Sequence, residues 1–98
     1  MTVKIYKVDA AKVSAIRQAT SADHWARNGY TLRAGKALGF DIEQHFLYVD
    51  APDEFFEAHE AEVLVDGVSL VEGNEFDNVK KAIDSEENSV ASGIALFG

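Results

Sequence analysis

The chain contains no cysteine, one proline and only nine basic residues against seventeen acidic ones. Without cysteine it cannot form disulfide bonds, thiolate zinc sites or a cysteine nucleophile. No apolar run approaches the roughly 20 residues that a membrane-spanning helix needs, and we expect no membrane association. The start alternates apolar and basic residues, unlike the apolar region of a secretory signal. We therefore expect a cytoplasmic protein.

The composition is that of one folded domain. Hydrophobic residues make up 47 % of the 98 residues and charged residues 27 %, which argues against disorder. Dividing the chain would leave parts too small to hold a core without metal or disulfides. We therefore expect a single domain over residues 1–98.

The net charge of −8 is unevenly distributed along the chain. Residues 1–49 hold seven basic and four acidic side chains, a balance of +3, whereas residues 50–98 hold two and thirteen, a balance of −11. Nucleic-acid binding depends on neutralising phosphates, so the acidic half is a poor candidate for it. The asymmetry is typical either of an acidic soluble surface or of a self-complementary one.

Hydrophobic periodicity predicts alternating strands and helices. A period of two indicates strands, and apolar residues three or four apart indicate helices. The expected order is a strand at 3–8, a helix at 9–20, a hairpin at 24–33, a strand at 45–50, a helix at 52–64, a strand at 68–71, a helix from 73 to about 84, and a final strand at 91–98.

The hairpin prediction rests on Asn28-Gly29, which stands between residues of β character. Both residue types tolerate positive φ, so the pair is a strong signal for a two-residue turn. A hairpin predicts a cost of about 1 kcal/mol or more for Gly29→Ala. The alternative is a helix through Trp25 that ends at Asn28-Gly29 in a left-handed cap, followed by a strand at 30–33.

Mixed elements in this order predict an α+β fold. The expected architecture is a two-layer sandwich, with helices packed on one face of a largely antiparallel sheet. A ferredoxin-like βαββαβ core with an added helix and an added strand fits the order of the elements.

Two segments carry a resemblance to known proteins. The stretches at 29–39, GYTLRAGKALG, and at 86–98, EENSVASGIALFG, resemble segments of small uncharacterised archaeal α+β proteins. The resemblance covers a minority of the chain and includes no catalytic signature. It implies membership of a group of proteins without an assigned activity and identifies no functional residue.

Three histidines are candidates for metal ligands or general bases. His59 with Glu60 and Glu62 would form a surface metal site only with a ligand from elsewhere in the chain, and we predict neither a metal site nor a cofactor. His24 and His45 are each candidates for a general base, but the sequence identifies no carboxylate partner for either. We therefore assign no catalytic residue.

A basic segment of the acidic chain predicts a ligand-binding site. Arg27, Arg33 and Lys36 lie in a glycine-containing segment between predicted strands, and His45 opens the next strand. An isolated basic pocket on an acidic protein attracts small anions and repels polyanions. These four residues, with His24 as a further neighbour, are the predicted site for a small anionic ligand.

The leading functional hypothesis is a small non-enzymatic association module that acts as a homodimer. Small sandwiches expose sheet edges and part of a sheet face, which a second copy can cover. The apolar segment at 91–98 adds to this expectation. The first alternative is an anion- or small-molecule-binding regulatory domain, and the second is a small α+β enzyme that uses a histidine base.

Overall fold

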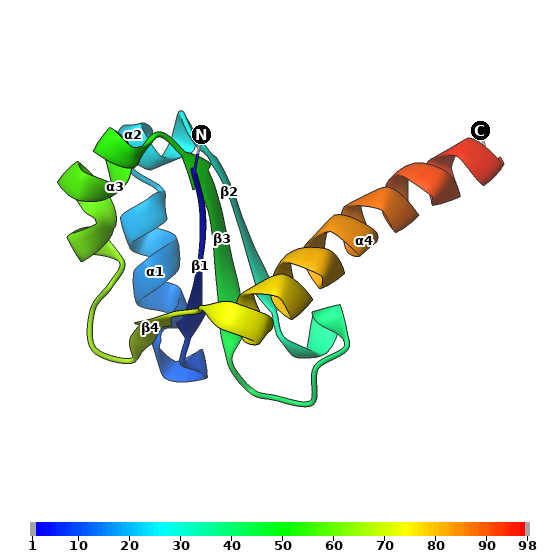
Figure 1. The fold of residues 1–98 in the computed structure, drawn as a ribbon, viewed down its shortest axis with the longest axis horizontal. Helices are drawn as coiled ribbons and strands as arrows, with labels where there is room; N and C mark the ends of the chain where they lie inside the picture. The colour runs from blue at the N-terminus through cyan, green and yellow to red at the C-terminus, as the bar shows by residue number, and fades with distance from the viewer. Residues whose placement is uncertain (1, 98) are drawn as a thin grey trace.

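The computed structural model describes the backbone of residues 2–97 and the side chains of residues 2–85. Six of the eight elements expected from periodicity are present, and they follow one another in the predicted order (Figure 1). The elements in order are β1 (Thr2–Val8), η1 (Ala10–Lys12), α1 (Val13–Thr20), α2 (Asp23–Ala26), β2 (Gly29–Ala34), η2 (Lys36–Leu38), β3 (His45–Ala51), α3 (Asp53–His59), η3 (Glu60–Glu62), β4 (Val68–Leu70) and α4 (Gly73–Phe97), where η marks a 3-10 helix.

The four strands form one open sheet with the order β2-β3-β1-β4. Every neighbouring pair is antiparallel, with Ile5 opposite Tyr48 between β1 and β3, and Thr31 opposite Tyr48 between β2 and β3. Helix α1 connects β1 to β2, and α3 connects β3 to β4, which is the split βαβ connectivity of the ferredoxin-like arrangement. The predicted α+β class and its largely antiparallel sheet are therefore confirmed.

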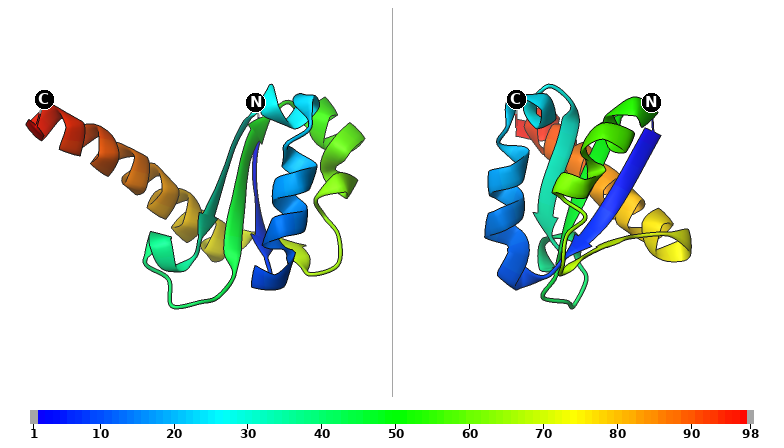
Figure 2. Two further views of the ribbon diagram at one scale, coloured as in Figure 1. Left: turned by 180° about the vertical axis from the view of Figure 1, so that it is seen from behind. Right: turned by 90° about the vertical axis from the view of Figure 1, so that its left-hand side faces the viewer.

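One face of the sheet is covered by α1, α2 and α3, as Figures 1 and 2 show. Alternate residues of β1 and β3 point to this face, because successive side chains of a strand face opposite sides. They meet apolar residues of the helices and of the segment after α3. The buried members of this main core are Tyr6, Val8, Ile16, Trp25, Leu47, Val49, Ala51, Phe56 and Val63.

The opposite face carries a second, smaller core beneath the start of α4. The sequence predicts helices on one face only, and α4 is the exception because its apolar residues Val79 and Ile83 cover the other one. Leu38, Phe40 and Ile42 of the β2–β3 connection complete this cover. The buried members of the second core are Ile5, Phe46, Val71, Val79 and Ile83.

The predicted hairpin at 24–33 is wrong. Residues 23–26 form the single-turn helix α2, and β2 pairs with β3 instead of with its own preceding segment. The indole of Trp25 is fully buried in the main core, and burying it outweighs the local turn signal. The helix alternative is right about α2, although Gly29 does not adopt positive φ. Instead Asn28 Nδ2 donates to the His24 carbonyl at 2.8 Å.

The predicted final strand at 91–98 is also wrong, because α4 continues as a helix to Phe97. Of that segment, residue 98 alone lies outside the described backbone. No proline interrupts this segment, and a single glycine, Gly93, costs a helix only about 1 kcal/mol. The far half of α4 leads away from the sheet (Figures 1 and 2). Within the described residues, no helix is long and apolar enough to span a membrane.

Candidate functional site

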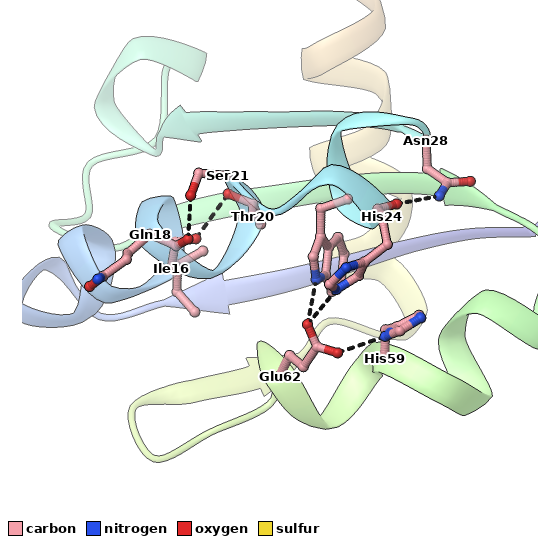
Figure 3. Close-up of polar contacts among 9 residues, drawn as sticks. Ile16, Gln18, Thr20, Ser21, His24, Asn28, His59 and Glu62 are labelled. Atoms are coloured by element: carbon pink, nitrogen blue, oxygen red, sulfur yellow. Dashed lines mark hydrogen bonds and ion pairs between the residues drawn. The ribbon is translucent and has the colours of Figure 1, made fainter.

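Two histidines and a glutamate from separate segments meet on the helical side of the sheet (Figure 3). His24 belongs to α2, His59 is the last residue of α3, and Glu62 ends η3. His24 and Glu62 are 38 residues apart in the chain. We call these three residues the His–Glu cluster.

Burial of the neighbouring residues explains why the cluster forms. Trp25 is fully buried, so the preceding His24 is held at the edge of the main core. Phe56 and Val63 are anchored in the same core and fix the segment that carries His59 and Glu62. His59 and Glu62 are three residues apart, a spacing that brings side chains together on a helical surface.

Glu62 is the centre of the cluster because its carboxylate accepts three hydrogen bonds. His24 Nε2 lies 2.7 Å from Oε1, and Trp25 Nε1 donates to the same oxygen at 3.0 Å. His59 Nδ1 lies 2.6 Å from the other oxygen, Oε2. One ring nitrogen of each histidine therefore faces its own oxygen of the Glu62 carboxylate.

Aromatic contacts hold the two imidazoles against each other. The His24 and His59 rings stack with centroids 4.2 Å apart and an interplanar angle of 27°. The ring of Phe55 lies 5.0 Å from His59 and 4.8 Å from Trp25, meeting the indole edge to face at 86°. Packing as well as hydrogen bonding thus limits the movement of these side chains.

The His–Glu cluster is accessible to solutes. Between 31 % and 39 % of each side chain is exposed. The hydrogen bond from His24, followed by those from His59 and Trp25, lowers the pKa of Glu62 to about 2. At neutral pH the cluster therefore presents a carboxylate anion with two imidazoles beside it.

This combination of groups is suited to holding a metal ion. One ligand atom from each of the three residues can be chosen so that all lie within 4.8 Å of one another. Tetrahedral coordination with bonds of about 2.0–2.1 Å needs ligand atoms roughly 3.3 Å apart. Small rotations of these partly exposed side chains would bring the ligand atoms to this separation.

The four residues of the predicted anion site do not converge. Arg27 precedes β2 and Lys36 follows it, and a strand of six residues spans roughly 20 Å. Arg33 pairs with Phe46 whereas His45 pairs with Ala34, so these two side chains point to opposite faces of the sheet.

The surroundings of these residues also differ. Lys36 Nζ forms an ion pair with Glu43 at 3.0 Å, and Arg33 Nη1 donates to the Leu32 carbonyl at 3.2 Å. The buried Nδ1 of His45 finds no hydrogen-bond partner among the described residues. Anion binding by any one of the four stays a prediction, without a shared pocket to support it.

The sequence does not predict the His–Glu cluster, because the hairpin signal at Asn28-Gly29 places His24 on a strand. His59 and Glu62 are recognisable as a pair without a third ligand, and His24 is recognisable as a candidate base without a carboxylate partner. The helix alternative for residues 23–26 was the available signal, because it sends Trp25 into the core and leaves His24 at the edge of α3.

Comparison with known proteins gives no relative from which a function could be transferred. No family model matches the chain, and neither a curated protein nor a solved structure matches it significantly.

Proposed function

We propose that the protein binds one divalent transition metal ion at the His–Glu cluster. The observation that carries this proposal is the arrangement around Glu62, where each carboxylate oxygen faces one imidazole nitrogen at 2.6–2.7 Å. The metal would take His24 Nε2, His59 Nδ1 and a Glu62 oxygen as ligands. Water would complete the coordination, since the cluster is partly exposed.

The ligand chemistry selects the class of ion. Imidazole nitrogen with one carboxylate suits Zn²⁺, Co²⁺, Ni²⁺ and Cu²⁺, whereas Mg²⁺ and Ca²⁺ prefer oxygen ligands alone. The chain has no cysteine to supply the thiolates that soft ions favour. Zn²⁺ is therefore the ion of choice for testing, with Mg²⁺ as the negative control.

The competing explanation is a metal-free clamp in which the same hydrogen bonds tie α2 to η3. A clamp needs protons on His24 Nε2 and His59 Nδ1, whereas a metal site needs lone pairs there. The two explanations therefore differ in their response to Zn²⁺, although they share every contact.

Isothermal titration with ZnCl₂ tests the proposal. We expect one ion per chain, and His24→Ala, His59→Ala and Glu62→Gln should each weaken binding by at least about tenfold, the lower bound for losing an outer-shell partner. His45→Gln is the matched control, since His45 is the third histidine and lies outside the cluster. MgCl₂ should give no binding heat. Absence of Zn²⁺ binding, or equal binding by all variants, would reject the metal site.

A second candidate function is association of two copies into a homodimer. Strands β2 and β4 form the open edges of the sheet, and edge strands can pair with another chain. The large hydrophobic side chains found exposed in the described part of the chain, Leu64, Val65 and Leu70, all lie in or just before β4. These features favour a second copy at the β4 edge.

Sedimentation at micromolar concentration tests this association. A homodimer should sediment near twice the chain mass of 10.7 kDa. If the contact is apolar, Leu70→Ser should shift the population toward monomer and about 1 M salt should change little, because screening acts on charges. Lys36→Ser, at a solvated position remote from β4, is the control. A strict monomer at all concentrations would contradict the homodimer.

Anion binding and general-base catalysis by a histidine remain alternatives from the sequence. An anion site would show localised NMR shifts around Arg33 or Lys36 on titration with phosphate at low salt. A hydrolytic activity lost in His24→Ala or His45→Gln would favour the enzyme. Cytoplasmic location likewise remains a prediction.

A further inference from the structure

Trp25 contributes a fixed hydrogen-bond donor to the His–Glu cluster. Its side chain is fully buried in the main core, and its ring meets Phe55 edge to face at a centroid distance of 4.8 Å. The indole Nε1 reaches out of the core and donates to Glu62 Oε1 at 3.0 Å. The donor thus belongs to a rigid part of the molecule, whereas its acceptor is at the surface.

The hydrogen bond from Trp25 differs from the other two on Glu62, because its donor proton stays in place when a metal ion binds. Coordination uses the lone pairs of His24 Nε2 and His59 Nδ1, so neither nitrogen can still donate to the carboxylate. In a neutral ring the proton moves through solvent to the other ring nitrogen, and in a charged ring it is released. The indole N–H has no lone pair to offer and is not displaced, so the Trp25 bond survives metal binding.

We propose that Trp25 is the positioning residue of the metal site, an inference that rests on the proposed metal-binding function. Its N–H occupies Glu62 Oε1 and turns Oε2 toward the ion as a single ligand atom. Outer-shell donors of this kind hold a ligating carboxylate in its coordinating orientation. The only tryptophan of the chain would therefore have two roles. Its ring packs in the main core, and its Nε1 orients the carboxylate that binds the metal ion.

The proposal predicts a loss of affinity when the N–H alone is removed. Replacing Trp25 with β-(3-benzothienyl)alanine puts sulfur in place of the N–H and keeps the size and shape of the ring. We expect Zn²⁺ to bind about 10–100-fold more weakly, the range typical of lost outer-shell partners. Trp25→Phe should weaken binding similarly in any preparation that folds. Val8→Ala removes a buried side chain from the same core but keeps the indole donor, and it should bind Zn²⁺ as tightly as the unmodified protein.

Two spectroscopic measurements separate positioning from general damage to the fold. The single indole N–H resonance should stay hydrogen-bonded and slow to exchange after Zn²⁺ is added. The visible spectrum of the Co²⁺-loaded protein should change in the benzothienyl variant and not in Val8→Ala. If the unmodified protein binds Zn²⁺ and the benzothienyl variant binds it equally well, Trp25 is not the positioning residue. If the unmodified protein binds no Zn²⁺, the proposed function fails and this inference fails with it.

Discussion

At the scale of single residues, two buried aromatic side chains make their polar contacts at glutamates of the same short helix. Trp25 donates to Glu62, and the Tyr6 hydroxyl donates to Glu60 Oε2 at 2.7 Å. Lys4 Nζ lies 3.0 Å from the same Glu60 oxygen and 5.0 Å from the centre of the Phe56 ring. Each buried ring thus satisfies its polar atom by reaching η3 (Glu60–Glu62), which explains why this short segment is held so closely to the sheet.

Tyr6 gives a prediction for alkaline pH. Burial, then its hydrogen bond to Glu60, raises the pKa of the Tyr6 hydroxyl far above its usual value of 10.0. A pKa that is higher in the folded state stabilises the fold below the unfolded value, and the benefit is lost as the pH rises beyond it. We therefore expect the free energy of unfolding to fall from about pH 10 upward, with Tyr6 unionised until the protein unfolds.

The Tyr6→Phe variant tests this assignment. It should lose about 1.5–3 kcal/mol of unfolding free energy at neutral pH, because a hydrogen bond to a charged group is removed. Its stability should then depend less steeply on pH above 10 than that of the unmodified protein, as measured by urea unfolding. A tyrosinate absorbance change for all three tyrosines of the native protein near pH 10 would contradict the account.

At the level of helices and strands, Gly35 and Gly29 show how a tertiary contact determines the free-energy cost of adding a side chain. A Cβ at Gly35 would lie 2.6 Å from Ile42 Cγ1 and 2.8 Å from the Gln44 carbonyl oxygen, where the β2–β3 connection closes on itself. The Gly35 amide also donates to that carbonyl at 2.9 Å, so the backbone cannot easily move away. At Gly29 the nearest atom to such a Cβ is 3.8 Å away.

We therefore expect alanine to destabilise the fold at Gly35 and to have little effect at Gly29. Gly35→Ala should destabilise the fold by about 1–3 kcal/mol, the usual cost of overpacking. Gly29→Ala should change stability by less than about 0.5 kcal/mol, because the site is exposed and its φ is negative. Thermal unfolding of the two variants checks this pair. A loss of about 1 kcal/mol or more in Gly29→Ala would contradict the negative φ of Gly29.

Hydrophobic periodicity predicted the helices and strands whose buried residues form a regular pattern in the sequence. β1, β3 and α1 each bury residues at the spacing of their own secondary structure. Helix α2 has a single turn and depends on Trp25 reaching the main core, which no local pattern reports. The end of α4 was misjudged because an apolar segment after a polar one suits either a strand or a continuing helix.

At the scale of the whole molecule, the ferredoxin-like arrangement brings the end of α3 against α2, and the candidate site exists only through that contact. His24 and Glu62 lie 38 residues apart, so neither spacing nor composition could pair them. The class of fold was predictable because it needs only the order of elements. The candidate site was not predictable, because it depends on how α2 and α3 pack against each other.

Zn²⁺ titration followed through the ring nitrogens of the histidines tests whether the His–Glu cluster binds a metal ion. In ¹⁵N-labelled protein at neutral pH, we expect His24 Nε2 and His59 Nδ1 to change to metal-bound nitrogen shifts at one equivalent of ZnCl₂. The nitrogens of His45 should keep their original shifts. If the spectra of His24 and His59 remain unchanged, or if all three histidines respond together, the His–Glu cluster is a hydrogen-bonded clamp and not a metal site.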